Sequence, residues 1–221
     1  MIGWWLALAL GSVEAEVALL QSLAPGPPAH ATEPVPWDGL PEHVGALPVR
    51  PRDDVARWVH LYTHELRSHT VTWLERLDAQ RAGMELVLRG EGLPEVLAVM
   101  AVVESGLLPE ATSTTGCAGT WQLSVPTALA LGLQVTDTVD ERRDPLLATP
   151  AAAMLLRELH ARFGSWELAL AAYNAGPQAV ATARADAGEG WLEALGSEPR
   201  HFVAKVQAMA VIDAHRERFG L

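Results

Sequence analysis

The sequence has one cysteine, an excess of acidic over basic residues and no long apolar run, and each of these features excludes a class of protein. One cysteine in 221 residues leaves no disulfide framework and no multi-cysteine zinc site. The 16 Lys and Arg against 27 Asp and Glu give a formal net charge of −11, which argues against a nucleic-acid partner. No apolar run reaches the roughly 18 residues that a transmembrane helix needs. A disulfide-rich, polytopic or DNA-binding protein is therefore excluded.

Metal-ligand spacing is also missing. The 8 histidines are scattered, and none belongs to a His-Glu-x-x-His pattern. His60 and His64 are placed to share a helix face, but no third ligand accompanies them. The sequence therefore predicts no metal site and no cofactor.

The N-terminus resembles an export signal. Residues 2–11 (IGWWLALALG) are apolar, and small residues precede a cleavage point after Ala15. We expect a signal peptide over residues 1–15 and a location in the periplasm or cell envelope. The alternative is an N-terminal helix of the mature protein that continues past Leu20. A lipid anchor is not expected, because the lone Cys117 lies far downstream of the apolar segment.

One domain is expected behind a linker. Eight prolines lie between Pro25 and Pro51, a density that favours an extended spacer over residues 16–51. From residue 52 to residue 221 the apolar spacing becomes helical, with at most a short β-hairpin between Thr112 and Leu123. The fold class is therefore mainly α. Helices are expected near residues 55–62, 71–77, 94–105, 127–131, 150–163, 166–173 and 200–218.

A single carboxyl group is the sharpest chemical feature. The predicted helix 94–105 is apolar on every side, which is typical of a buried central helix, and Glu104 stands at its end before Ser105 and Gly106. Burial and the negative end of the helix dipole both raise the pKa of such a carboxyl group. A carboxyl group that stays protonated near neutral pH is suited to general-acid cleavage of a glycosidic bond. By itself, an acidic residue here is better explained as a half-exposed side chain on a last helical turn.

Two sequence blocks change that balance. Residues 104–123 (ESGLLPEATSTTGCAGTWQL) resemble the signature of family-1 lytic transglycosylases, the murein-cleaving enzymes of glycoside hydrolase family 23. Upstream, residues 73–76 (WLER) and 92–94 (GLP) resemble the segment that precedes the catalytic helix in the membrane-bound, D-type members. Residues 172–176 (AYNAG) resemble a second motif of the same family. Two residues depart from the family pattern. Thr120 stands where Leu is usual, and Cys117 stands where a small residue is common. We expect Cys117 to be a buried, inert thiol.

The resemblance implies a lysozyme-like helical domain that binds peptidoglycan glycan strands and uses no cofactor. Glu104 is then the single catalytic acid and base, and the products carry 1,6-anhydromuramyl ends. The same resemblance places substrate-binding groups at Ser105, Ser113, Gln122, Tyr173 and Asn174.

Alternatives remain for several residues. Trp121 is a candidate for stacking on a sugar ring, although a core position fits it equally well. Gln122 is also explained as an amide that ties down its loop, and Glu110 as an exposed loop residue. For the whole protein, the alternatives are a goose-type-like lysozyme, which would need a second carboxylate in the cleft, and an inactive glycan-binding module.

Overall fold

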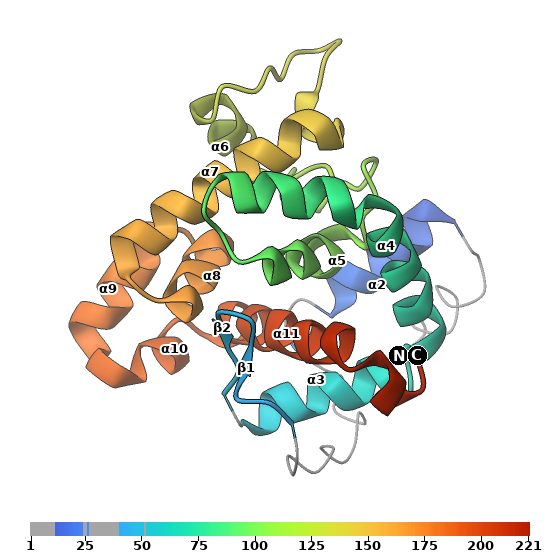
Figure 1. Cartoon of the computed structure of the whole chain (residues 1–221). Helices are drawn as coiled ribbons and strands as arrows, with labels where there is room; N and C mark the ends of the chain where they lie inside the picture. Colours follow the sequence, from blue (N-terminus) through green and yellow to red (C-terminus); the bar gives the residue numbers. More distant parts are fainter. Residues whose placement is uncertain (1–11, 24–25, 27–39, 51) are drawn as a thin grey trace.

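The computed structural model describes residues 12–23, 26, 40–50 and 52–221 (Figure 1). Within these ranges the protein is built almost entirely of helices, and its sheet has two strands, β1 (His43–Val44) and β2 (Leu47–Pro48). The expectation of a mainly α fold is confirmed. None of the described helices is both long and apolar enough to cross a membrane.

The helices follow one another closely along the chain, with short 3-10 turns between several of them. In order they are α2 (Val13–Ser22), α3 (Asp53–Thr63), α4 (Arg67–Gly90), η1 (Glu95–Ala98), α5 (Val99–Ser105), α6 (Val125–Ala130), η2 (Glu141–Arg143), α7 (Pro145–Phe163), α8 (Trp166–Ala175), α9 (Pro177–Ala187), η3 (Gly188–Gly190), α10 (Trp191–Ala194), α11 (Ser197–Ala214) and η4 (Arg216–Phe219).

Two buried helices form the centre of the molecule. The α5 helix is enclosed on all sides, as its apolar sequence predicts, and Val99 to Val102 are fully buried. The α11 helix packs against α3, α5 and α8, and it crosses the middle of the view in Figure 1. The expected helix 94–105 is divided in two, because Pro94 has an extended ψ of 127° and a 3-10 turn precedes α5.

The segment expected to be a linker contributes to the core at both of its ends. Leu19 of α2 is 2% exposed, and Leu47 of β2 is completely buried. The Gln207 side chain of α11 donates a hydrogen bond to the Pro48 carbonyl at 3.0 Å. The β1–β2 hairpin therefore packs on the helical domain, whereas the sequence predicts an extended spacer there. The apolar segment 2–11 and the prolines between residues 27 and 39 lie outside the described residues.

The hairpin expected between Thr112 and Leu123 forms only in part. Isolated bridges pair Thr112 with Ala118 and Ala118 with Leu123, so this segment is a compact loop and not a pair of strands. The two helices α9 and α10 were not predicted, because α9 buries few residues and α10 is only 4 residues long. In α9 only Val180 and Ala183 are buried.

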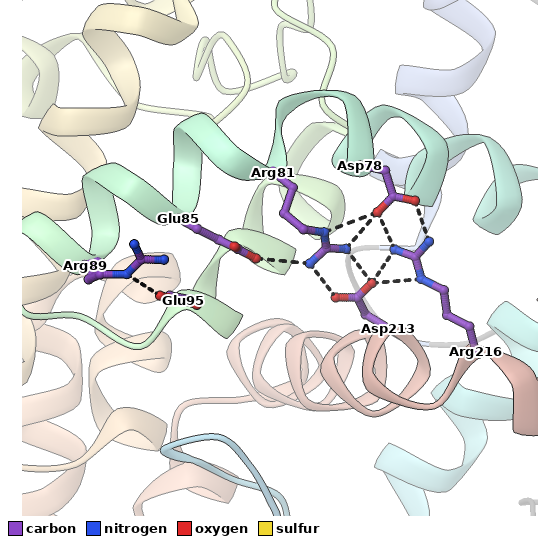
Figure 2. A network of polar contacts seen from close by, with 7 residues as sticks. All are labelled: Asp78, Arg81, Glu85, Arg89, Glu95, Asp213 and Arg216. Atoms are coloured by element: carbon purple, nitrogen blue, oxygen red, sulfur yellow. Dashed lines mark hydrogen bonds and ion pairs between the residues drawn. The ribbon is translucent and has the colours of Figure 1, made fainter.

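A network of ion pairs joins α4 to the end of α11 (Figure 2). Arg81 pairs with Asp213 at 2.7 Å and with Asp78 at 3.0 Å, and Arg216 pairs with the same two carboxylates. The Arg216 and Arg81 guanidinium groups lower the pKa of Asp78. Two cations alternate with two anions across the helix pair, and this arrangement fixes the C-terminal end of the domain against α4.

Candidate active site

Glu104 lies at the carboxyl end of the buried helix α5. The helix stops at Gly106, which has a φ of +61° and carries a carbonyl that accepts a 2.9 Å hydrogen bond from Arg76. A Cβ atom at this glycine would lie 2.7 Å from the Trp73 indole nitrogen, so only glycine fits. The helix exit predicted from the sequence thus places Glu104 on the last turn, with part of its side chain open to a cavity.

The cavity in front of Glu104 has a volume of about 390 Å³. It gathers residues that lie far apart in the sequence, from α2, α5, the loop after α5, α8 and α11. Six of the residues predicted for the site line it: Glu104, Ser105, Ser113, Gln122, Tyr173 and Asn174.

Burial raises the pKa of the Glu104 carboxyl group to about 8. The nearby Lys205 ammonium group opposes this effect, and the Glu198 carboxylate adds to it. Among the described residues, no hydrogen-bond donor holds the carboxyl group in its charged form. Glu104 is therefore a protonated acid at neutral pH, as the sequence predicts.

Three cavity residues on α11 were not predicted. Glu198, Phe202 and Lys205 are spaced by four and three residues, so they lie on one helix face, and all three line the cavity. The Lys205 ammonium group lies 5.3 Å from the centroid of the Trp58 ring and 3.4 Å from the Leu23 carbonyl oxygen. Burial lowers its pKa to about 8, against the effect of the two carboxylates. The predicted helix 200–218 contains Phe202 and Lys205 but not Glu198, and its sequence does not show which of its faces meets a cavity.

The loop after α5 is held by its own hydroxyl groups. Ser113 accepts a hydrogen bond from the Cys117 backbone NH at 3.0 Å, and its hydroxyl lies 2.9 Å from that of Thr115. Cys117 is half-buried and lines the cavity, so the expectation of a buried thiol is wrong.

Ser105 and Gln122 use their polar groups largely within the protein. The buried Ser105 hydroxyl donates to the Thr120 carbonyl at 2.9 Å, so it anchors the loop. This hydroxyl is therefore not free for the sugar binding that the sequence analysis expects of Ser105. Gln122 has a φ of +48°, and its side-chain NH₂ donates to the carbonyls of Gly119 at 2.8 Å and Ala111 at 3.3 Å. The amide nitrogen of Gln122 therefore holds the loop together, which is the second of the two roles that the sequence allows for this residue.

Trp121 is a core residue, so of the two interpretations that the sequence left open the structure supports the core position and not the sugar-stacking one. Its side chain is 0% exposed, and the indole NH donates to the Thr149 hydroxyl at 2.9 Å. The Trp121 carbonyl accepts a 2.7 Å hydrogen bond from the Tyr173 hydroxyl. Tyr173 is thereby fixed at the cavity wall, where its ring lines the space in front of Glu104.

Other expectations concern residues outside the cavity. Glu110 is an exposed loop residue, with 76% of its side chain accessible. The His60 and His64 rings stack on each other with centroids 4.2 Å apart. Within the described ranges, no group of His, Cys, Asp or Glu is arranged to hold a metal ion.

The helical fold, with a protonated carboxyl group at the end of a buried helix beside a cavity, is that of a lysozyme-like domain. Residues 86–191 match the transglycosylase SLT domain. The matched range contains the acid, the loop after α5 and the 172–176 block, but it excludes α2 and α11.

The chain is also homologous to named lytic transglycosylases. It is 33% identical over 141 residues to membrane-bound lytic murein transglycosylase D of Escherichia coli K12, covering 61% of this chain and 31% of that protein. It is 36% identical over 119 residues to peptidoglycan transglycosylase gp16 of Escherichia phage T7, covering 52% and 9%. The structure resembles an inactive mutant of lytic transglycosylase Slt from Pseudomonas aeruginosa, with a TM-score of 0.55, 23% identity and coverage of 76% and 31%. This chain thus spans about a third or less of the length of these relatives.

Proposed function

We propose that this protein is a peptidoglycan lytic transglycosylase that cleaves the β-1,4 bond between N-acetylmuramic acid and N-acetylglucosamine. The observation that carries the proposal is the position of Glu104, a carboxyl group with a pKa of about 8 on the floor of a cleft. Its surroundings match the SLT domain, and the relatives bear the names of murein and peptidoglycan transglycosylases.

Glu104 performs both proton transfers in the proposed reaction. The protonated carboxyl group donates its proton to the glycosidic oxygen as the bond from that oxygen to C1 of the muramic acid breaks. The resulting carboxylate accepts the proton of the C6 hydroxyl of the same sugar, whose oxygen then forms a bond to C1. The products are a free 4-hydroxyl end and a 1,6-anhydro end, water is not consumed, and Glu104 returns to its protonated form.

The cavity wall supplies groups that suit an amino-sugar chain. The Ser113 hydroxyl and the Asn174 amide line the cavity and offer both donors and acceptors to hydroxyl and N-acetyl groups. Tyr173 contributes a ring surface fixed through its hydroxyl. We assign these three residues to substrate binding, and we assign Ser105 and Gln122 to holding the loop that carries Ser113.

One observation favours a hydrolytic alternative. Glu198 is an exposed carboxylate that lines the same cavity, and hydrolysis by inversion would need such a second carboxylate to activate water. Digestion of purified murein followed by mass spectrometry of the soluble products distinguishes the two reactions. We expect anhydro-ended muropeptides; products that carry only reducing N-acetylmuramic acid ends would contradict the transglycosylase and support the lysozyme.

The Glu104 pKa predicts a fall in activity on the alkaline side. Because the acid must be protonated, kcat/KM is expected to decrease above about pH 8. Lys205→Met removes the cation that lowers the Glu104 pKa, so the alkaline limb should move upward by about one pH unit. Lys205→Arg retains the positive charge and should leave the limb in place. A limb that does not move in Lys205→Met would contradict this role for Lys205.

We propose further that the protein is exported to the cell envelope, where murein lies. The apolar segment 2–11 and the small residues before Glu16 support this proposal. The mature protein isolated from the envelope should begin at about Glu16 when its N-terminus is sequenced. Cleavage there removes the first three residues of α2 and keeps Glu16, Val17 and Gln21. An intact Met1 on protein recovered from the cytoplasm would contradict export.

A further inference from the structure

The short helix α2 lies between two cavities. Val17 and Gln21 line the cavity in front of Glu104, and the same two residues line a second cavity of about 660 Å³. The second cavity is bounded on its other side by Glu110, Thr112 and Arg143. Since α2 contributes to both walls, it separates the space beside the acid from the surface beyond.

A charged anchor holds α2 beside the catalytic helix. The Glu16 carboxylate accepts hydrogen bonds from the Arg76 guanidinium group, one of them at 3.0 Å, and from the Trp73 indole NH. The same arginine donates to the carbonyl of Gly106, two residues after Glu104. Figure 1 shows α2 next to α5, and the two helices are in contact. The position of α2 is thus tied to the end of the helix that carries the acid.

A polar bridge closes the gap between α2 and the loop after α5. The Gln21 side-chain NH₂ donates a 3.0 Å hydrogen bond to the Thr112 carbonyl. This bond crosses from a helix near the N-terminus to the loop that carries Ser113. Leu20 lines the active-site cavity beside it and adds an apolar surface. The barrier therefore consists of the Gln21–Thr112 bridge above a wall formed by Val17 and Leu20.

We propose that α2 is a barrier that ends the glycan-binding groove on this side of Glu104 and thereby limits how many sugar units bind there. The proposal rests on the proposed function, because it takes the occupant of the cavity to be a β-1,4-linked amino-sugar chain. The α2 helix lies outside residues 86–191, the range that matches the SLT domain, whereas its partner Thr112 lies inside that range. A strand end, and not the middle of a strand, fits a groove closed in this way.

Oligosaccharide binding tests the barrier without turnover. The full chain carrying Glu104→Gln is titrated with β-1,4-linked N-acetylglucosamine oligomers of increasing length. Affinity should rise with length and then stop rising once the oligomer reaches α2. Adding Gln21→Ala removes the bridge, and adding Glu16→Ala removes the anchor. For Gln21→Ala we expect the longest oligomers to bind about fivefold more tightly, the effect of one hydrogen bond. Glu16→Ala removes several hydrogen bonds, so its effect on the longest oligomers should be at least as large. In both variants the shortest oligomers should bind as before.

A neighbouring residue provides the matched control. Ser22 lies on the same helix, is exposed and lines neither cavity, and its hydroxyl donates only to the Leu19 carbonyl of its own helix. Ser22→Ala should leave the length dependence unchanged. The proposal is overturned if Gln21→Ala binds long oligomers no better than its parent, or if no oligomer binds to any variant. Failure of the proposed chemistry would instead appear as reducing-end products from murein, which this binding experiment does not measure.

Discussion

Replacement of Glu104 by Gln is expected to reduce murein cleavage by at least about a thousandfold, because each of the two proton transfers contributes on the order of 10²–10⁴-fold. Gln has the same size and still forms hydrogen bonds, but its amide neither donates a proton to a leaving oxygen at neutral pH nor accepts one afterwards. The measurement is the initial rate of muropeptide release from purified sacculi. Binding of glycan oligomers should survive, since the rest of the cavity is unchanged.

Glu110 provides the control for this substitution. It lies six residues further along the chain, on the exposed loop outside the cavity, and Glu110→Gln makes the same chemical change. Activity should stay within a few-fold of the wild type, as is usual for surface positions. Activity that survives Glu104→Gln and disappears in Glu110→Gln would show that the acid is the other carboxyl group.

The difference in stability between Glu104→Gln and the wild type should change with pH in a direction that the Glu104 pKa fixes. The folded protein holds the Glu104 proton up to about pH 8, whereas the unfolded chain releases it near the ordinary value of 4.5. Folding therefore takes up a proton between these values, and the free energy of unfolding of the wild type falls as the pH rises through this window. The variant lacks this dependence, so its stability relative to the wild type should increase from pH 5 to pH 8 in urea denaturation.

The position of Glu104 could be predicted from the sequence, because its signal is local. An apolar run, a carboxyl group and a Ser-Gly exit specify a buried helix with an acid on its last turn, and the neighbouring motifs specify the loop that faces it. The role of Trp121 could not be found in this way. A tryptophan that binds a sugar and one that packs in a core can have the same local sequence. The indole of Trp121 is buried by residues that are distant in the sequence, and its NH donates to the Thr149 hydroxyl, 28 residues away.

The two walls supplied by α2 and α11 depend on distant contacts. Arg76 pairs with Glu16 across 60 residues, and Gln21 bonds to Thr112 across 91. No periodic pattern encodes such pairs, and the prolines that follow α2 indicate a linker. The α11 helix was predicted, but it is buried along most of its length, so its sequence does not show which face meets the cavity. Lys205 is identified as a cavity residue only from the folded structure, in which it lies over the Trp58 ring and close enough to Glu104 for their charges to interact.

Gly119→Ala is expected to have the largest effect on stability among single substitutions in the active-site loop. Gly119 has a φ of +83°, and a Cβ atom there would lie 1.8 Å from the backbone carbonyl oxygen of Arg142 in η2. Neither backbone segment can yield without breaking the loop, because Gly119 also donates to the Ala111 carbonyl and accepts from Gln122. Steric overlap added to left-handed strain should cost at least about 3 kcal/mol in the free energy of unfolding.

Gly116 separates the two contributions. It has the same φ of +83°, but a Cβ atom there would meet nothing within 4 Å. Gly116→Ala should therefore cost only the strain of the backbone conformation, about 1 kcal/mol. Urea denaturation of both variants measures the difference, and equal losses would contradict the close approach of Gly119 to η2. Because Ser113 and Gln122 belong to this loop, Gly119→Ala should also abolish most of the cleavage activity, while Gly116→Ala retains it. Gly116 and Gly119 are thus needed for different physical reasons: Gly116 permits a turn, and Gly119 lets the loop pack directly on a neighbouring backbone.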